Sequence, residues 1–284
     1  MTEPPDRAST AYRREFGEVL RRLRKARGLG IGEVAGGVGW SSAKLSKLES
    51  GLRGTDEWEV GVLLGAVGAD RGTRDYVRGL MSPDRRAFVR SVEGTIDTLT
   101  GVRSQERLAL SMRCFEPFVV PALLQTEDYM RAVFHAEVGF GESHTRAVWA
   151  RLNRQDAWRY KETASAFYVA ENALATVVGG PVVMHAQMLW LHGVSQHADA
   201  VVRIVPSSAG LPVFTSRAVE MHFSGAADPV VYLELDGITT FVDDPPVVRA
   251  YQQRFAVLGE VSLDPDASRE LIARQADHWR ERIE

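Results

Sequence analysis

Cysteine is nearly absent from this chain, and so are long hydrophobic runs. Cys114 is the single cysteine among 284 residues, which excludes an internal disulfide and a cysteine-rich metal site. No uninterrupted apolar run approaches the roughly 18 residues that a membrane-spanning helix needs. The first ten residues, MTEPPDRAST, contain no apolar signal region. We therefore expect a cytoplasmic protein that has no membrane partner.

Motifs for catalysis and for cofactor binding are also missing. The sequence contains neither an HExxH metal motif nor a GxSxG nucleophile elbow. Gly28, Gly30 and Gly32 form a glycine run like that of a phosphate loop. They follow an arginine-rich segment rather than a strand, so the context that a dinucleotide site requires is lacking. The sequence predicts no catalytic residue, no metal ligand and no cofactor, and it gives no positive sign of an enzyme.

Charge is distributed unevenly along the chain, although the net charge is only −3. Residues 1–82 contain fourteen basic and eleven acidic side chains, a net charge of +3. Residues 83–284 contain twenty basic and twenty-six acidic side chains, a net charge of −6. The length is typical of two domains. We predict a basic domain over residues 1–82, which we call the head, and an acidic domain over residues 83–284, which we call the body.

Residues 29–51 have the spacing of two short helices that cross at a tight turn. Apolar side chains recur at the inner positions Val34, Val38, Leu45 and Leu48. Ala35 is small at the place where the second helix crosses the first, and Gly39 can adopt the positive φ that the turn requires. This pattern predicts a helix-turn-helix.

The second helix of this unit is the expected reader of DNA. Ser41 or Ser42 caps it, and its N-terminal residues would lie at base edges in the major groove. Residues 11–54 carry ten Lys or Arg against four Glu, which is typical of a surface that faces phosphates. The side chains expected to contact DNA are Ser41, Ser42, Lys44, Lys47, Arg53, Arg24 and Arg27. An arginine-rich helix can equally be a solvated face, so the DNA interpretation depends on the spacing and the charge together.

The segment from Gly28 to Gly51 resembles the head of Xre-type, lambda-repressor-like regulators. The matching positions are Gly28, Leu29, Glu33, Ala35, Gly39, Ser41, Ser46, Glu49 and Gly51. The resemblance implies a compact bundle of about five helices whose partner is double-stranded promoter or operator DNA. A homodimer is expected, because one such head covers only a half-site. The chain departs from the family pattern at Ile31, which replaces a glutamine, and at three interior glycines of the same helix, Gly32, Gly36 and Gly37.

The predicted fold class is α+β and mostly α, with a five-helix head followed by a larger body that contains a small β-sheet. Apolar steps of three and four over residues 85–99 predict a connector helix beyond a boundary near Ser82-Pro83. Short β-rich runs predict strands at residues 107–115, 166–170, 201–205, 218–223 and 230–235. Helices are expected at residues 147–160 and 182–192, and two more near the C-terminal end.

Five short motifs follow one another along the body. They are PALLQTEDYMR at residues 121–131, an element with Arg151, Arg154 and Gln155, YVAENAL at residues 168–174, VRIVP at residues 202–206 and VVYLE at residues 230–234. In the order and spacing of these motifs the body resembles the uncharacterised C-terminal domain of WhiJ-like bacterial regulators. The resemblance implies a body that senses a small-molecule effector or contacts a small acidic partner protein. The polar side chains that could line a ligand pocket are Gln125, Tyr129, Arg151, Gln155, Glu171, Arg203 and Glu234. The same side chains could instead fasten helices to the sheet through paired hydrogen bonds.

Two functions from different classes follow. The leading hypothesis is a DNA-binding transcription regulator of the Xre type whose body senses an effector or a partner. The alternative is a degenerate head attached to a body that works as a ligand-binding protein or an enzyme, and its motivation is the glycine-rich helix with Ile31. A cleft lined by Gln125, Arg151 and Glu171 and large enough for a metabolite would favour the alternative.

Overall fold

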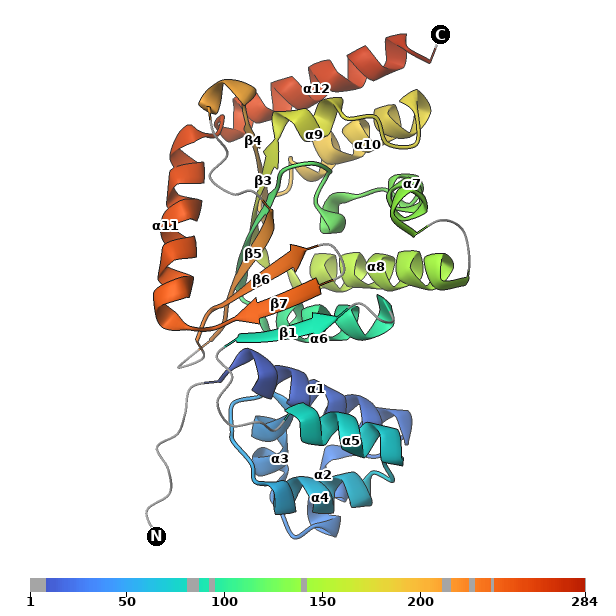
Figure 1. Ribbon diagram of the computed structural model, residues 1–284, viewed down its shortest axis with the longest axis vertical. Coiled ribbons are helices and arrows are strands. Elements are labelled where there is room, and N and C mark those ends of the chain that lie inside the picture. The colour runs from blue at the N-terminus through green and yellow to red at the C-terminus, as the bar shows by residue number, and fades with distance from the viewer. Residues whose placement is uncertain are drawn as a thin grey trace.

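Two packed units are visible in the computed structural model, which describes residues 9–80, 87–91, 95–138, 142–210, 216–224, 228–235 and 238–283. The helical head lies at one end of the molecule, next to the body built around a β-sheet (Figure 1). None of the helices in these ranges is long and apolar enough to cross a membrane. The arrangement confirms the predicted α+β class with an N-terminal helical head.

The described part of the head consists of five helices. They are α1 (Ala11–Ala26), α2 (Ile31–Gly37), α3 (Ser42–Glu49), α4 (Glu57–Ala66) and α5 (Arg71–Leu80). Apolar residues three and four positions apart turn toward one shared core. Its buried members include Phe16, Leu20, Val34, Leu45, Leu48, Leu63 and Val77. Each helix therefore contributes one apolar stripe to the core and leaves its polar side in water.

Helix α1 crosses α3 at very short range, and Gly17 makes this possible. A Cβ atom at position 17 would overlap the carbonyl oxygen of Leu48 and would lie 2.7 Å from that of Glu49. Real Cβ atoms do not approach other atoms so closely, so a larger residue would push α1 away from α3. The position of α3 in the head thus depends on a glycine in the arginine-rich helix.

One mixed sheet of seven strands, within the described ranges, forms the centre of the body. The strands are β1 (Ala87–Ser91), β2 (Ser111–Glu116), β3 (Ala164–Ala170), β4 (Ala200–Val205), β5 (Arg217–His222), β6 (Val230–Leu235) and β7 (Ile238–Val242). Their order is β1-β7-β6-β5-β2-β3-β4. Strands β2, β3 and β4 run parallel, and the other neighbouring pairs are antiparallel. The sheet is larger than the small one that the sequence predicted.

Helices cover both faces of this sheet. On one side of the sheet lie α6 (Thr95–Leu108), α8 (Glu142–Lys161), α9 (Glu171–Ala175), α10 (Pro181–Val194) and α12 (Pro265–Glu281), and on the other lies α11 (Pro245–Val261) (Figure 1). Helix α7 (Glu127–Val138) packs against α8 and α10 on the first side. Alternation along β2 explains the division, because successive side chains point to opposite faces. Cys114 belongs to the core that contains Trp279, whereas Phe115 packs with Phe255 and Leu258 of α11.

The structure corrects the predicted connector helix at residues 85–99. Ala87–Ser91 form β1, which pairs with β7, and α6 begins only at Thr95. The apolar spacing that suggested a helix was short, and pairing with a strand far along the chain overrides it. The expected strand at residues 107–115 also begins later, since Arg107 still belongs to α6. The strands expected between residues 166 and 235 are confirmed as β3 to β6, and the boundary expected near Ser82-Pro83 lies outside the described residues.

A matched pair of substitutions tests the packing of the head. Gly36→Ala in α2 is expected to stabilise the protein by about 0.5–1 kcal/mol, because alanine favours helix and no atom lies within 4 Å of a Cβ built there. Gly17→Ala is expected to destabilise the protein despite the same gain in propensity, because its Cβ would overlap the backbone of α3. Urea unfolding measures both changes. Equal effects of the two substitutions would contradict the close crossing of α1 and α3.

Candidate nucleic-acid interface

The turn between α2 and α3 has the geometry of a helix-turn-helix. Gly39 adopts a φ of +72°, and the backbone N–H of Trp40 donates to the carbonyl oxygen of Ala35 at 2.7 Å. The Oγ atom of Ser41 accepts a hydrogen bond from the backbone N–H of Lys44 at 3.1 Å. Ser41 is therefore the N-cap of α3, and Ser42 is its first helical residue.

The N-terminal end of α3 presents short polar side chains to solvent. Its exposed residues are Ser41, Ser42, Ala43, Ser46 and Lys47. Serine hydroxyls can donate to and accept from base edges and phosphates, and a lysine ammonium can hold a phosphate. The surface has the polarity that a recognition helix needs, with one exposed cation at its far end.

Lys44, which the sequence predicted to approach bases, is engaged within the head. Its Nζ atom lies 2.6 Å from Oε1 of Glu59 on α4 and 3.7 Å from the centre of the Trp40 ring. Arg53 Nη2 approaches the same carboxylate oxygen at 3.5 Å, and Thr55 Oγ1 donates to its other oxygen at 3.0 Å. Two expected DNA contacts are thus held by one carboxylate at the edge of the interface.

Arg24 requires a correction, because it is not a surface cation. The residue is only 8% exposed, and its guanidinium forms two hydrogen bonds to the Glu49 carboxylate, at 2.7 and 2.8 Å. A third hydrogen bond, at 2.9 Å, reaches the carbonyl oxygen of Leu29. The hydrogen bonding to Glu49 raises the pKa of Arg24 above its usual value. Arg24 therefore fastens α1 to α3 instead of facing phosphate.

Arg27 and Lys47 remain on the surface as predicted. Arg27 is exposed, although one of its nitrogens, Nη2, donates to the carbonyl oxygen of Gly68 at 2.7 Å. Lys25, the residue after Arg24, is also exposed. The cations of the arginine-rich segment thus divide into those that hold the fold and those that face water.

Sequence reasoning missed Glu59, although a local signal for it exists. Asp56 caps α4 by accepting a hydrogen bond from the backbone N–H of Glu59 at 2.7 Å. An Asp followed by Glu three residues later is a recognised start signal for a helix. This signal places Glu59 in the first turn of α4, but it does not reveal that the carboxylate turns toward Lys44.

The body residues from the PALLQT segment and α8 satisfy one another. Gln125 donates from Nε2 to the carbonyl oxygen of Val120 at 2.7 Å and accepts from Arg151 Nη1 at 3.0 Å. Gln155 donates to the carbonyl oxygen of Gln125 at 2.6 Å. Tyr129 is fully buried, its hydroxyl accepts from the N–H of Val120 at 3.2 Å, and burial raises its pKa to about 12. These contacts fasten α8 to the segment before α7.

Glu234 belongs to a second group of paired charges, between the sheet and α8. It forms a hydrogen-bonded ion pair with Arg217 and accepts from the hydroxyl of Tyr232 at 2.8 Å. Burial alone would raise the pKa of Glu234, but the positive charges of Arg217 and Arg151 lower it below its usual value. Glu234 is thus held as an anion by arginines from two elements.

Glu171 and Arg203 lie apart from these groups. Glu171 accepts from the backbone N–H of Ser207 at 2.7 Å, and Arg203 donates to the carbonyl oxygens of Ser262 and Leu263 at 2.9 and 2.8 Å. The small void between α6, α8 and the sheet has a volume of about 10 Å³, room for one water molecule at most. In the described part of the body, the seven predicted residues do not surround a common cavity.

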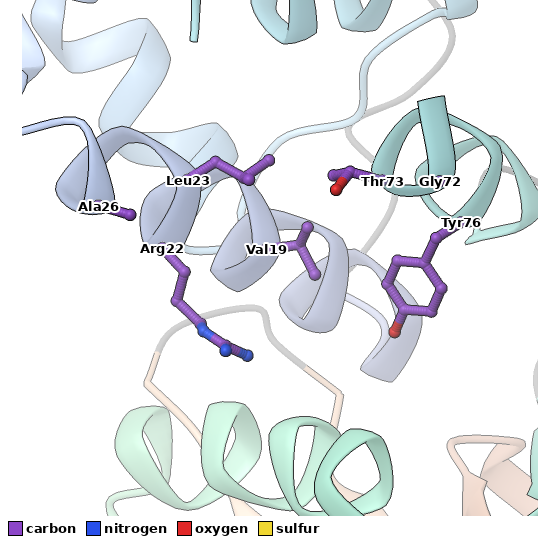
Figure 2. Close-up of a pocket in the computed structure, with 7 residues that line it drawn as sticks. All are labelled: Val19, Arg22, Leu23, Ala26, Gly72, Thr73 and Tyr76. Atoms are coloured by element: carbon purple, nitrogen blue, oxygen red, sulfur yellow. The ribbon is translucent and has the colours of Figure 1, made fainter. Parts of the chain in front are cut away.

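A larger hollow, of about 410 Å³, lies in the head between α1 and α5. Figure 2 shows its lining residues, which are Val19, Arg22, Leu23 and Ala26 from α1 and Gly72, Thr73 and Tyr76 from α5. The Tyr76 hydroxyl is already bonded to the carboxylate of Glu15 at 2.7 Å. The hollow contains none of the residues predicted to bind a ligand.

Polar contacts from α1 attach the head to the body. The backbone N–H of Ala11 donates to Asp243 at 2.7 Å, and Gln105 of α6 donates to the carbonyl oxygen of Ala11 at 2.8 Å. Gln105 also accepts from Nε of Arg14, a residue only 1% exposed whose pKa is lowered by burial to about 9. Arg107 of α6 binds the carboxylate of Glu18 at 2.9 Å. Sequence patterns did not predict these contacts, because they join residues far apart along the chain.

Comparison with known proteins supports both units. Residues 99–274, more than half of the chain, match the model of a family described as a domain of unknown function (DUF5753). The chain belongs to the DUF5753 family. In this DUF5753 protein, residues 15–77 match a second model, described as a helix-turn-helix domain, which spans α2, α3 and the turn between them. No curated protein matches the sequence.

One solved structure is similar to this DUF5753 protein along much of its length. It is the structure of TrmBL2, an archaeal chromatin protein described as showing a novel mode of DNA binding. The identity is 11%, the TM-score is 0.31, and the match covers 83% of this chain and 88% of that chain. A TM-score of this size does not establish a shared fold, so the helix-turn-helix rests on residues 15–77 and their geometry.

Removal of the Arg24 side chain separates its two possible roles. Arg24→Ala is expected to lower the free energy of unfolding by about 3 kcal/mol, because Glu49 is left as a buried and unpaired anion. Lys25→Ala, the matched control on the exposed side of α1, is expected to change it by less than about 0.5 kcal/mol. Urea denaturation gives both values. An Arg24→Ala protein of normal stability that loses affinity for DNA would show that Arg24 is a phosphate contact after all.

The contacts between α1 and α6 are expected to make head and body unfold together. Gln105→Ala removes the hydrogen bonds that Gln105 makes with Nε of Arg14 and with the carbonyl oxygen of Ala11, and the loss of the acceptor of the buried Nε–H costs about 1–3 kcal/mol. Scanning calorimetry should show one transition for the native protein and two for Gln105→Ala. Gln196→Ala, on the surface of the body, should keep a single transition. Two transitions in the native protein would refute the coupling.

Proposed function

We propose that this protein is a DNA-binding transcription regulator. The observation that carries the proposal is the exposed, serine-rich N-terminal end of α3 on a helix-turn-helix whose turn and cap have the required geometry. In the proposed complex Ser41 and Ser42 approach base edges in the major groove, while Lys47 and Arg27 hold phosphates. The resemblance of the head to Xre-type regulators and the match of residues 15–77 to a helix-turn-helix domain support this function.

Lys44 and Arg53 take part by exchanging one anionic partner for another. Both approach the carboxylate of Glu59, and both are partly exposed, so water and salt already weaken these pairs. A DNA phosphate that reaches this edge competes with Glu59 for the two cations. Glu59 therefore lowers the affinity for every DNA sequence equally. The discrimination between DNA sequences then depends more on Ser41 and Ser42, which face the bases.

The body, in this proposal, controls the head. The resemblance to WhiJ-like regulators suggests a small-molecule effector or a small acidic partner protein as its signal. The contacts of Ala11, Arg14 and Glu18 with the body provide a physical route, because a shift of α6 would move α1 and with it α3. A regulator of this kind acts in the cytoplasm, where bacterial promoter DNA lies.

The alternative function, a ligand-binding protein or an enzyme with a degenerate head, has less support. Gln125 and Arg151 bond to each other, and Glu171 is engaged elsewhere with Ser207. A ligand at these residues would have to replace hydrogen bonds that already connect helices to the sheet. These hydrogen bonds therefore favour a role for Gln125, Arg151 and Glu171 in holding the elements of the body together.

Substitutions of single charges test the DNA interface. Lys47→Ala is expected to weaken binding to a selected duplex and to reduce the slope of log affinity against log salt by about one unit, because one phosphate contact is lost. Glu59→Gln is expected to strengthen binding and to steepen the slope by about one unit or more, because Lys44 and Arg53 are released. Fluorescence anisotropy over a series of salt concentrations measures both changes.

Arg274→Ala, an exposed cation of α12 in the body, is the control and should leave the slope unchanged. The duplex is obtained by selection from random DNA at moderate salt. If no sequence is enriched, the protein is not a sequence-specific regulator. If Glu59→Gln weakens binding, Glu59 is a direct contact to bases and not a competitor of phosphate.

A further inference from the structure

From Val60 to Ala66, helix α4 carries no polar side chain on any side, although half of this stretch faces water. Its inner side fills the core of the head with Val60, Leu63 and Leu64. Its outer side consists of Trp58, Gly61, Val62, Gly65 and Ala66, all of them exposed, and Trp58 is 81% exposed. A helical stretch that is hydrophobic all round is normally covered on all sides. Because α4 lies on the side of the head away from the body (Figure 1), the body does not cover it.

We propose that this face binds the same face of a second copy of this chain, with the two α4 helices antiparallel. Trp58 and Gly65 are seven residues apart, two helical turns, so both lie on the outer side of α4. In a symmetric pair whose two-fold axis passes between Gly61 and Val62, each Trp58 indole lies over the Gly65 of the other copy. The contact between Trp58 of one copy and Gly65 of the other therefore occurs twice, once on each side of the axis, as a self-complementary two-fold interface requires.

The packing of the head itself does not require the two glycines. No atom lies within 4 Å of a Cβ built at Gly61 or at Gly65, and neither residue has a positive φ. Glycine inside a helix costs stability relative to alanine. A second backbone and an indole ring that approach α4 closely would use the space that the absent side chains leave.

Charge selects the antiparallel orientation. Asp56 and Glu57 lie at the start of α4, and Arg27 lies at its end, bonded to the carbonyl oxygen of Gly68. Antiparallel packing brings the acidic start of each helix to the basic end of the other, and it opposes the two helix dipoles favourably. Glu57 pairs with Arg78 at 3.3 Å, and the two side chains are 75% and 70% exposed, so this pair leaves Glu57 accessible.

The size of the face predicts weak association. A stable interface commonly buries about 800 Å² on each partner, whereas a Trp with a few small neighbours supplies much less. The dimer should therefore exchange with monomer at micromolar concentrations. It does not depend on DNA binding, although two DNA half-sites would hold two such heads together.

The oligomeric state of the full chain tests the proposal, by sedimentation velocity at concentrations up to about 100 µM. The native protein should show a concentration-dependent dimer, and Trp58→Arg and Gly65→Glu should each lower the association constant at least tenfold. The matched controls are Trp149→Arg, an exposed tryptophan of α8, and Gly193→Glu, an exposed helical glycine of α10 with open space around it. Both should associate like the native protein.

A disulfide test locates the face independently of affinity. Val62→Cys, next to the proposed axis, should form a covalent dimer under mild oxidation, whereas Val257→Cys on α11 should not, although the two valines are similarly exposed at 37% and 42%. The native Cys114 is buried, and burial raises the pKa of its thiol to about 12, so it stays inert. A native protein that remains monomeric, a dimer unaffected by Trp58→Arg and Gly65→Glu, or equal cross-linking at positions 62 and 257 would each overturn the proposal.

Discussion

Two buried guanidinium groups on α1 determine how the whole molecule is assembled. Arg24 binds Glu49 of α3, and Arg14 binds Gln105 of α6. A guanidinium carries five N–H donors, and away from water they need partners. If α1 moved away from α3, the buried charges of Arg24 and Glu49 would be unpaired, at a cost of several kcal/mol. If it moved away from α6, a buried N–H donor of Arg14 would lose its acceptor. Helix α1 therefore fixes α3 within the head and the head on the body.

This constraint changes the meaning of the basic charge in the head. The net charge of +6 over residues 11–54 suggested a continuous phosphate-facing surface. In the structure, Arg14 and Arg24 are internal, and Lys44 and Arg53 share the carboxylate of Glu59. The exposed positive surface of the head is thus smaller than the composition suggests, and the DNA surface that we propose is the N-terminal end of α3. Polar side chains of the body are likewise used for internal contacts, because Gln125, Arg151 and Gln155 connect α8 to its neighbours.

Sequence patterns predicted those elements that are stabilised by contacts between residues close together in the sequence. The turn at Gly39, the cap at Ser41 and the inward positions of Leu45 and Leu48 depend on contacts within a few residues, so spacing was sufficient to identify them. The strands β3 to β6 were likewise visible as short β-rich runs between turn residues. The connector helix was wrong because β1 is stabilised by β7, a strand that lies elsewhere in the sequence. Arg24 and Lys25 are neighbours with the same charge, and nothing local distinguishes the internal one from the exposed one.

By itself, the sequence determined the helix-turn-helix unit, the uneven distribution of charge along the chain, and the α+β class. Steric fit, helix periodicity and turn chemistry act over short stretches of chain, and these are readable from residue types. Only the tertiary structure showed which charged side chains are paired inside the fold. It also showed that β1 belongs to the sheet and that α1 joins the head to the body. Each of these depends on the distance between side chains far apart in the sequence, because a charge takes its role from the partner that burial brings next to it.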